Sequence, residues 1–129
     1  MGIRGDGDRI IIIKTNSYGE EEWKKYVDYN DEYAEPRYIF ETDDGGYVIG
    51  SYSSDNKILI TKLQSDGTQE WHNEDYNYGT FQNMKKSLSG GYVAIGIINV
   101  GSLDYNFVKI DENGTIEYGY PIYPTIDPN

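Results

Sequence analysis

Tyrosine and acidic side chains gather in two polar segments, YVDYNDEYAEPRY at residues 26–38 and EDYNYGT at residues 74–80. Aromatic rings flanked by carboxylates can stack on a sugar or hold a cation over the ring face. They can equally form a protein interface, where tyrosine is enriched. We predict that five tyrosines of these segments gather on one rim and bind a ligand: Tyr26, Tyr29, Tyr33, Tyr76 and Tyr78.

The residues capable of acid–base chemistry form no recognisable catalytic pattern. His72 is the single histidine, and it could form a relay with Glu74. Carboxylates such as Asp28 and Asp31 could serve a glycosidase, whose acid and base must face one another across the sugar. Both sets of residues are also expected on ordinary strands and loops of a non-catalytic acidic protein. We predict that the protein is not an enzyme and has no catalytic residue.

Acidic residues beside glycine, such as Asp44, Asp66 and Asp111, match calcium loops only in fragments. A calcium loop alternates Asp-x-Asp-x-Asp-Gly and adds a distant Glu, whereas this sequence offers SDG and DENG. The chain has no cysteine, so disulfides and thiolate sites are excluded. We predict turn acids, no metal ligand and no cofactor.

The charge of the chain narrows the class of partner. The net charge of −11 argues against nucleic acid and against anionic membrane surfaces, and it fits a cationic ligand or simple solubility. The N-terminal MGIRGDGD lacks the apolar core of a secretion signal. We predict a soluble protein whose cellular compartment the sequence does not reveal.

The elements that must position these side chains recur along the chain. The intervals are 48 and then 47 residues for three sets: Lys14, Lys62 and Lys109; Gly19, Gly67 and Gly114; Trp23, Trp71 and Tyr118. A second landmark, GGYVIG at 45–50, returns as GGYVAIG at 90–96. Internal repeats of this length are typical of propellers and other repeat architectures.

Within one period the pattern predicts four short strands. Runs rich in β-branched and aromatic residues, IIIIKT at 10–15, KILITKL at 57–63 and YNFVKI at 105–110, each lead into a hairpin. The turns fall at Tyr18-Gly19, Asp66-Gly67 and Asn113-Gly114, and the last two pairs favour two-residue type I′ turns. RYIFET at 37–42 and FQNMKKS at 81–87 precede the Gly-Gly turns at 45–46 and 90–91.

The first strand of each hairpin is apolar on both faces, so its sheet needs cover on both sides. Stacked antiparallel sheets or the interior of a propeller provide such cover. The predicted core consists of Ile12, Trp23, Val48, Ile60, Trp71, Val93 and Phe107.

The order of DGGYVIG and, after a short gap, ILITKLQSDGTQEW resembles the blade repeat of bacterial and archaeal β-propeller-like repeat proteins. The resemblance covers about residues 9–119. It implies an all-β fold of propeller-type repeats of four-stranded antiparallel sheets. The Gly-Gly pair would lie between the first two strands of a blade, and the Trp on the outer strand. The resemblance implies a scaffold and no particular reaction.

The expected strands amount to about two and a half blades, whereas propellers generally close with four to eight. The chain is then a fragment of a longer propeller, one copy in an oligomer that completes a ring, or a different packing of the same hairpins. We favour the oligomer, because repeat units seldom stand alone. The expected division is a disordered or tag-like arm (1–8), a β-repeat domain (9–119) and an extended Pro-rich tail (120–129).

The function predicted from these features is a non-catalytic binding or interaction module that associates with itself. Its partners would be further copies or other proteins, or else a carbohydrate or cationic ligand. The alternative is a carbohydrate-binding domain, lectin-like or weakly glycosidase-like, that uses the tyrosine rim.

Overall fold

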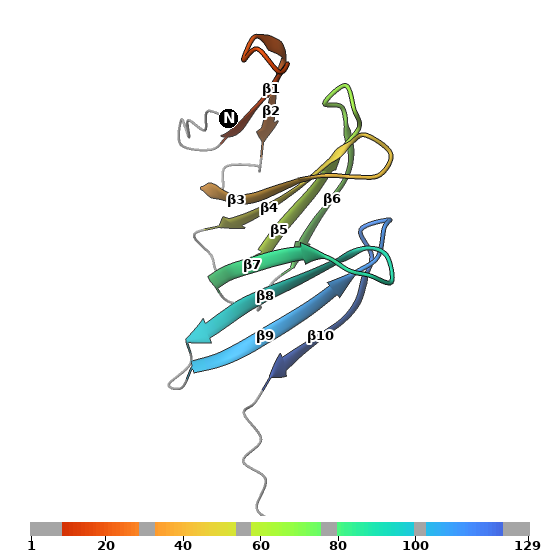
Figure 1. The fold of residues 1–129 in the computed structure, drawn as a ribbon. Helices are drawn as coiled ribbons and strands as arrows, with labels where there is room; N and C mark the ends of the chain where they lie inside the picture. Colours follow the sequence, from red (N-terminus) through yellow and green to blue (C-terminus); the bar gives the residue numbers. More distant parts are fainter. Residues whose placement is uncertain (1–8, 29–32, 54–57, 76–79, 100–102, 123–129) are drawn as a thin grey trace, which may run out of the picture.

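The computed structural model describes residues 9–28, 33–53, 58–75, 80–99 and 103–122 as an all-β chain (Figure 1). Its ten strands are β1 (Arg9–Thr15), β2 (Glu21–Asp28), β3 (Ala34–Glu41), β4 (Tyr47–Ser53), β5 (Ile58–Leu63), β6 (Gln69–Asp75), β7 (Thr80–Lys86), β8 (Tyr92–Asn99), β9 (Leu103–Ile110) and β10 (Ile116–Ile122). Strand β10 continues through the first three residues of the segment predicted to be a tail. The predicted arm at 1–8 and the rest of that tail lie outside the described residues.

The strands form three antiparallel sheets that follow one another along the chain (Figure 1). The N-terminal hairpin pairs β1 with β2, the middle sheet has the order β3-β4-β5-β6, and the C-terminal sheet has the order β7-β8-β9-β10. The all-β, antiparallel class predicted from the sequence is therefore confirmed. The described strands form no closed sheet.

Five hairpin turns share one hydrogen-bond pattern. They are Asn16–Glu20, Thr42–Gly46, Gln64–Thr68, Ser87–Gly91 and Asp111–Thr115. In each turn the first residue donates its N–H to the carbonyl four residues on, and the glycine in the fourth position donates back to the first. These glycines have φ between 80° and 92°, a conformation that costs residues with a Cβ about 1–2 kcal/mol.

This pattern corrects the predicted type I′ turns at Asp66-Gly67 and Asn113-Gly114. Three residues, not two, separate Gln64 from Thr68, and the glycine is the last of the three. A three-residue hairpin loop places its left-handed residue at that point, after the tight turn. The dipeptides identified the positions of the turns correctly and their length incorrectly.

The second glycine of each Gly-Gly pair serves close packing. A Cβ at Gly46 would collide with the carbonyl oxygen of Leu63, and one at Gly91 with that of Ile110. These carbonyls belong to β5 and β9. The Thr42–Gly46 turn therefore packs directly against the end of β5, and the Ser87–Gly91 turn against the end of β9.

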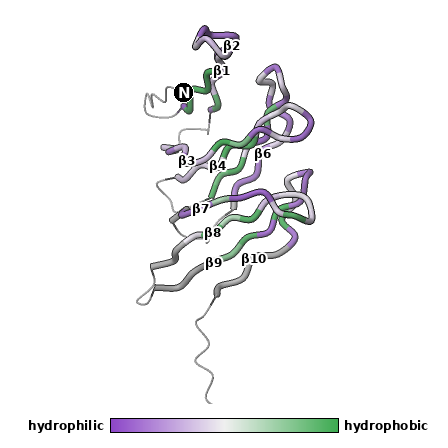
Figure 2. Tube along the Cα trace, viewed as in Figure 1, coloured by the Kyte–Doolittle hydropathy of each residue, from purple (hydrophilic) through white to green (hydrophobic). Residues whose placement is uncertain are grey.

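Apolar side chains are buried in two clusters, one on each face of the middle sheet, and Figure 2 shows the hydrophobic residues concentrated along the strands. The cluster beside the N-terminal hairpin contains Ile10, Ile12, Val27, Ala34, Ile49, Leu59 and Leu63. The cluster beside the C-terminal sheet contains Val48, Ile58, Ile60, Met84, Tyr92, Ala94, Val108 and Ile110. All six residues of β5 are buried, as expected for a strand covered on both faces.

Three of the residues predicted to form the core, Ile12, Val48 and Ile60, are buried. Trp23 and Trp71 are partly buried and pack against the two clusters. Val93 and Phe107 are only half-buried. Both belong to the face of the C-terminal sheet that points away from the middle sheet, so the neighbour that buries Val48 and Ile60 has no equivalent there among the described strands.

At each of the two junctions between units, a tryptophan of one unit lies against a turn glycine of the next. A Cβ placed on Gly67 would lie 2.6 Å from Cγ of Lys25 and 3.1 Å from the Trp23 ring. A Cβ on Gly114 would lie 2.5 Å from the Trp71 ring. The indole N–H of Trp71 is buried without a hydrogen-bond partner in the described part of the chain. The ring therefore contributes shape and apolar area, and the glycine is needed to make room for it.

We expect Gly114→Ala to destabilise the protein more than Gly19→Ala does. Gly19 has the same positive φ, and its added Cβ would meet nothing within 4 Å among the residues that the structure describes, so this control measures the backbone strain alone. Gly19→Ala should lower the free energy of unfolding by about 1 kcal/mol. Gly114→Ala should lower it by about 3 kcal/mol, because overpacking against Trp71 adds about 1–3 kcal/mol. Urea unfolding of dilute protein measures both, and equal losses would contradict the packing role of Trp71.

Candidate functional site

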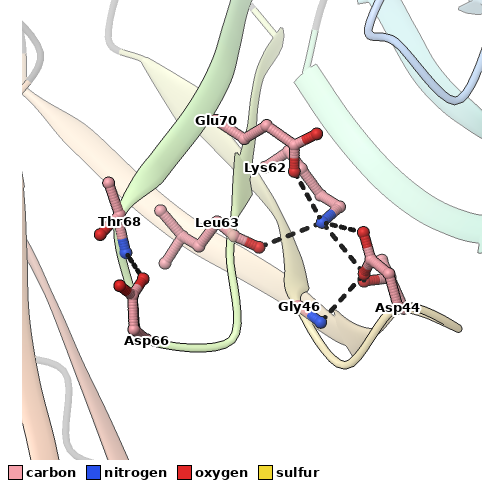
Figure 3. Close-up of polar contacts among 8 residues, drawn as sticks. Asp44, Gly46, Lys62, Leu63, Asp66, Thr68 and Glu70 are labelled. Atoms are coloured by element: carbon pink, nitrogen blue, oxygen red, sulfur yellow. Dashed lines mark hydrogen bonds and ion pairs between the residues drawn. The ribbon is translucent and has the colours of Figure 1, made fainter.

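A buried ammonium group lies at the end of the middle sheet that carries the Thr42–Gly46 and Gln64–Thr68 turns, called here its turn end (Figure 3). The side chain of Lys62 is only 5% exposed. Its Nζ donates to both oxygens of Asp44 at 3.1 and 3.2 Å, to Glu70 at 3.1 Å and to the carbonyl of Leu63 at 3.2 Å. A buried charge is stable only when it is paired and hydrogen-bonded, and these contacts meet that requirement.

The pairing of lysine with glutamate recurs in every unit. Each repeat lysine faces a glutamate eight residues later, and the pairs are Lys14–Glu22 at 3.8 Å, Lys62–Glu70 at 3.1 Å and Lys109–Glu117 at 3.5 Å. Lys62 lies under the Thr42–Gly46 turn, and Lys109 donates to the carbonyl of Gly90 in the Ser87–Gly91 turn. Lys14 has no such turn above it among the described residues, and its side chain is 37% exposed.

Asp44 joins this lysine to its own turn. The Thr42 hydroxyl, the Gly46 N–H and Lys62 all donate to the carboxylate. These interactions, with Thr42 first, hold the pKa of Asp44 well below its usual range. Donation from Thr68 likewise lowers the pKa of Asp66, and Asp111 accepts from the N–H groups of Asn113 and Thr115. These three carboxylates therefore stabilise the hairpin turns to which they belong.

A cavity of about 230 Å³ opens between the turn ends of the middle and C-terminal sheets. Its charged lining is Asp43, Asp44, Lys62, Lys86 and Glu112. Both lysines are already paired, Lys62 with Asp44 and Lys86 with Asp43 at 3.8 Å. An anionic ligand would have to displace these carboxylates, so the cavity is not preorganised for one.

Tyr92 lines the same cavity and is 7% exposed. Burial raises the pKa of Tyr92 to about 12, and the carboxylates of Asp44 and Glu112 add to the effect. The phenol is therefore neutral at physiological pH. The cavity offers a ligand this neutral hydroxyl and two ion pairs.

His72 bridges two strands of the middle sheet. Its Nδ1 lies 2.9 Å from the hydroxyl of Thr61, and its Nε2 lies 3.1 Å from a carboxylate oxygen of Glu74. The order of hydroxyl, imidazole and carboxylate is that of a catalytic triad. Thr61, however, has no exposed surface, so its hydroxyl is inaccessible to a substrate. The arrangement favours a structural bridge.

The structure describes two of the five tyrosines predicted to bind a ligand. Tyr26 is 57% exposed and Tyr33 is 52% exposed, and no ring contact joins them within the described residues. Tyr26 lies on β2 opposite Ile11, on the hairpin face that points away from the middle sheet. Tyr29, Tyr76 and Tyr78 lie outside the described residues, so the predicted rim is not tested.

The outer face of the C-terminal sheet repeats the pattern of a buried face. In the middle sheet Val48 pairs with Lys62, which pairs with Trp71. In the C-terminal sheet the corresponding row is Val93, Lys109 and Tyr118. Ile95 and Phe107 form the next row, and Phe107 is the counterpart of Ile60. Sequence reasoning placed Val93 and Phe107 in the core. Val93 lies 45 residues after Val48 and Phe107 lies 47 residues after Ile60, and this periodicity was the signal that both belong to the next unit and need a further sheet for full burial.

Comparison of the chain with protein-family models, with curated proteins and with solved structures finds no match. In the described part of the chain, no helix has the length and apolar character needed to cross a bilayer. The described residues also contain no group of three or more acidic, histidine or cysteine side chains placed to hold a metal ion.

We expect Asp44 to contribute to stability at neutral pH and to lose that contribution in acid. Its folded-state pKa is depressed, so the contribution is complete above the unfolded pKa of about 4 and is lost as pH falls from there. Asp44→Asn should therefore show a smaller loss of stability between neutral pH and acid than the wild type. Asp43→Asn, the fully exposed neighbour, is the matched control. Chemical unfolding at both pH values measures this, and identical profiles for the two variants would contradict it.

Proposed function

We propose that the protein is a non-catalytic interaction module built on propeller-type repeats, and that it associates with copies of itself. The observation that carries this proposal is the outer face of the C-terminal sheet. Val93 and Phe107 on this face are the repeat counterparts of Val48 and Ile60, which are 0% and 2% exposed under the neighbouring sheet.

The physical argument rests on the cost of leaving such a face in water. Burying apolar surface is worth about 25 cal/mol per Å². Val93, Ile95 and Phe107 are half-buried neighbours on this face, and a docked sheet would cover the apolar surface that they leave accessible. Lys109 adds no obstacle, because its ammonium group is already held by the carbonyl of Gly90 and by Glu117. A sheet of the same kind can therefore dock here without desolvating a free charge.

The acidic character of the chain sets the conditions for this association. A net charge of −11 makes copies repel one another at low salt. Ionic strength near the physiological value reduces the Debye length to about 8 Å. Apolar contact between sheet faces then outweighs the long-range repulsion, so the association is expected to strengthen with salt.

We expect the wild-type protein to form oligomers whose mass rises with concentration in sedimentation velocity at physiological ionic strength. Ile95→Glu, which places a carboxylate in the middle of the outer face, should weaken this association by about tenfold or more. Leu88→Glu makes the same change at a fully exposed turn position and should leave the association unchanged. A wild type that is monomeric at every concentration, with or without added salt, would overturn the proposed function.

A further inference from the structure

The two junctions between units have the same direction along the chain. The preceding unit supplies an aromatic ring, and the following unit supplies the turn glycine on which that ring lies. Trp23 of the hairpin covers Gly67 of the middle sheet, and Trp71 of the middle sheet covers Gly114 of the C-terminal sheet. The units therefore have a donor face and an acceptor face that differ from each other.

One acceptor position remains open at the N-terminal end. Gly19 is the counterpart of Gly67 and Gly114, with φ of 83°, yet no atom of the described residues lies within 4 Å of its added Cβ. Strand β1 is incompletely covered on the same side in the described part of the chain. Ile11 and Ile13 are half-buried, whereas their counterparts in the middle sheet, Leu59 and Thr61, have no exposed surface.

One donor position remains at the C-terminal end. Tyr118 pairs with Lys109 in the sheet register, as Trp71 pairs with Lys62 and Trp23 with Lys14. It therefore holds the register position of the ring that covers the next unit. The N-terminal hairpin therefore presents an acceptor position that no described residue fills. The C-terminal sheet presents the register position of a donor ring, and the two are of the types that pack together at the internal junctions.

We propose that a second copy of this chain fills the open acceptor. The outer face of the C-terminal sheet of one copy docks on the outer face of the N-terminal hairpin of the next, with Tyr118 placed over the Gly19 turn. This inference rests on the proposed function and names its partner surface. The contact is heterologous, so successive copies form a ring if the rotation closes and a filament if it does not.

The hairpin's own residues suit this contact. Tyr26 lies opposite Ile11 and is exposed on that face, which makes one of the predicted binding residues an interface residue. The hairpin has two strands where the acceptor units inside the chain have four. The docked area is therefore smaller than at an internal junction, and the association is expected to be reversible.

A complementation experiment tests the polarity of the contact. Ile13→Glu disables the hairpin face, where Lys24 lies opposite and can pair with the new carboxylate, and Ile95→Glu disables the sheet face. Each variant alone should be monomeric at concentrations where the wild type associates. An equimolar mixture should form a dimer and nothing larger, because the first variant retains an intact sheet face and the second an intact hairpin face.

Sedimentation velocity measures these masses, and circular dichroism with urea unfolding confirms that each variant is folded. Tyr118→Ala, a milder change, should weaken wild-type association by about tenfold. If Ile13→Glu associates as the wild type does, the sheet face binds another surface; the proposed function then survives and the head-to-tail contact is overturned. A mixture of folded variants that remains monomeric also overturns the contact. A wild type that never associates overturns the proposed function as well.

Discussion

Strand β5 is apolar on both of its faces, and the arrangement of the other sheets follows from that property. A strand of this kind reaches low free energy only when a neighbour covers each face, because the hydrophobic effect scales with apolar area removed from water. Leu59 is covered by the N-terminal hairpin and Ile60 by the C-terminal sheet. The N-terminal hairpin and the C-terminal sheet also have apolar residues on both faces, but the described strands cover only one face of each.

The junctions between units are set by shape as much as by hydrophobicity. Protein interiors are packed to crystal-like density, so an indole ring can lie on a turn only where the turn residue has no Cβ. The pairing of Trp71 with Gly114 meets this condition, and so does that of Trp23 with Gly67. Gly67 and Gly114 therefore have two reasons to be glycine, the positive φ of the turn and the ring of the preceding unit.

Polar groups beside the hairpin turns compensate for the burial of a charged side chain between the stacked sheets. Lys62 is enclosed by two carboxylates and a carbonyl, which compensates for its loss of hydration. The same network explains why the inter-sheet cavity is a weaker candidate for a binding site than the sheet face. Its charged groups are already paired, whereas the side chains of Val93 and Ile95 have no sheet above them in the described part of the chain.

The sequence by itself determined the all-β class, the positions of the turns and the interval between units, because these depend on local residue preferences and on a periodicity that survives without coordinates. It could not determine the length of the hairpin loops, since Asp-Gly suits both two- and three-residue turns. It also could not show that Ile60 lies in the core whereas Phe107 lies on an outer sheet face, because the two residues occupy corresponding positions in their units. Only the tertiary structure decided that difference. Burial depends on which sheet lies on the other side, and the C-terminal sheet has the same pattern as the middle sheet but no further sheet on its outer face in the described part of the chain.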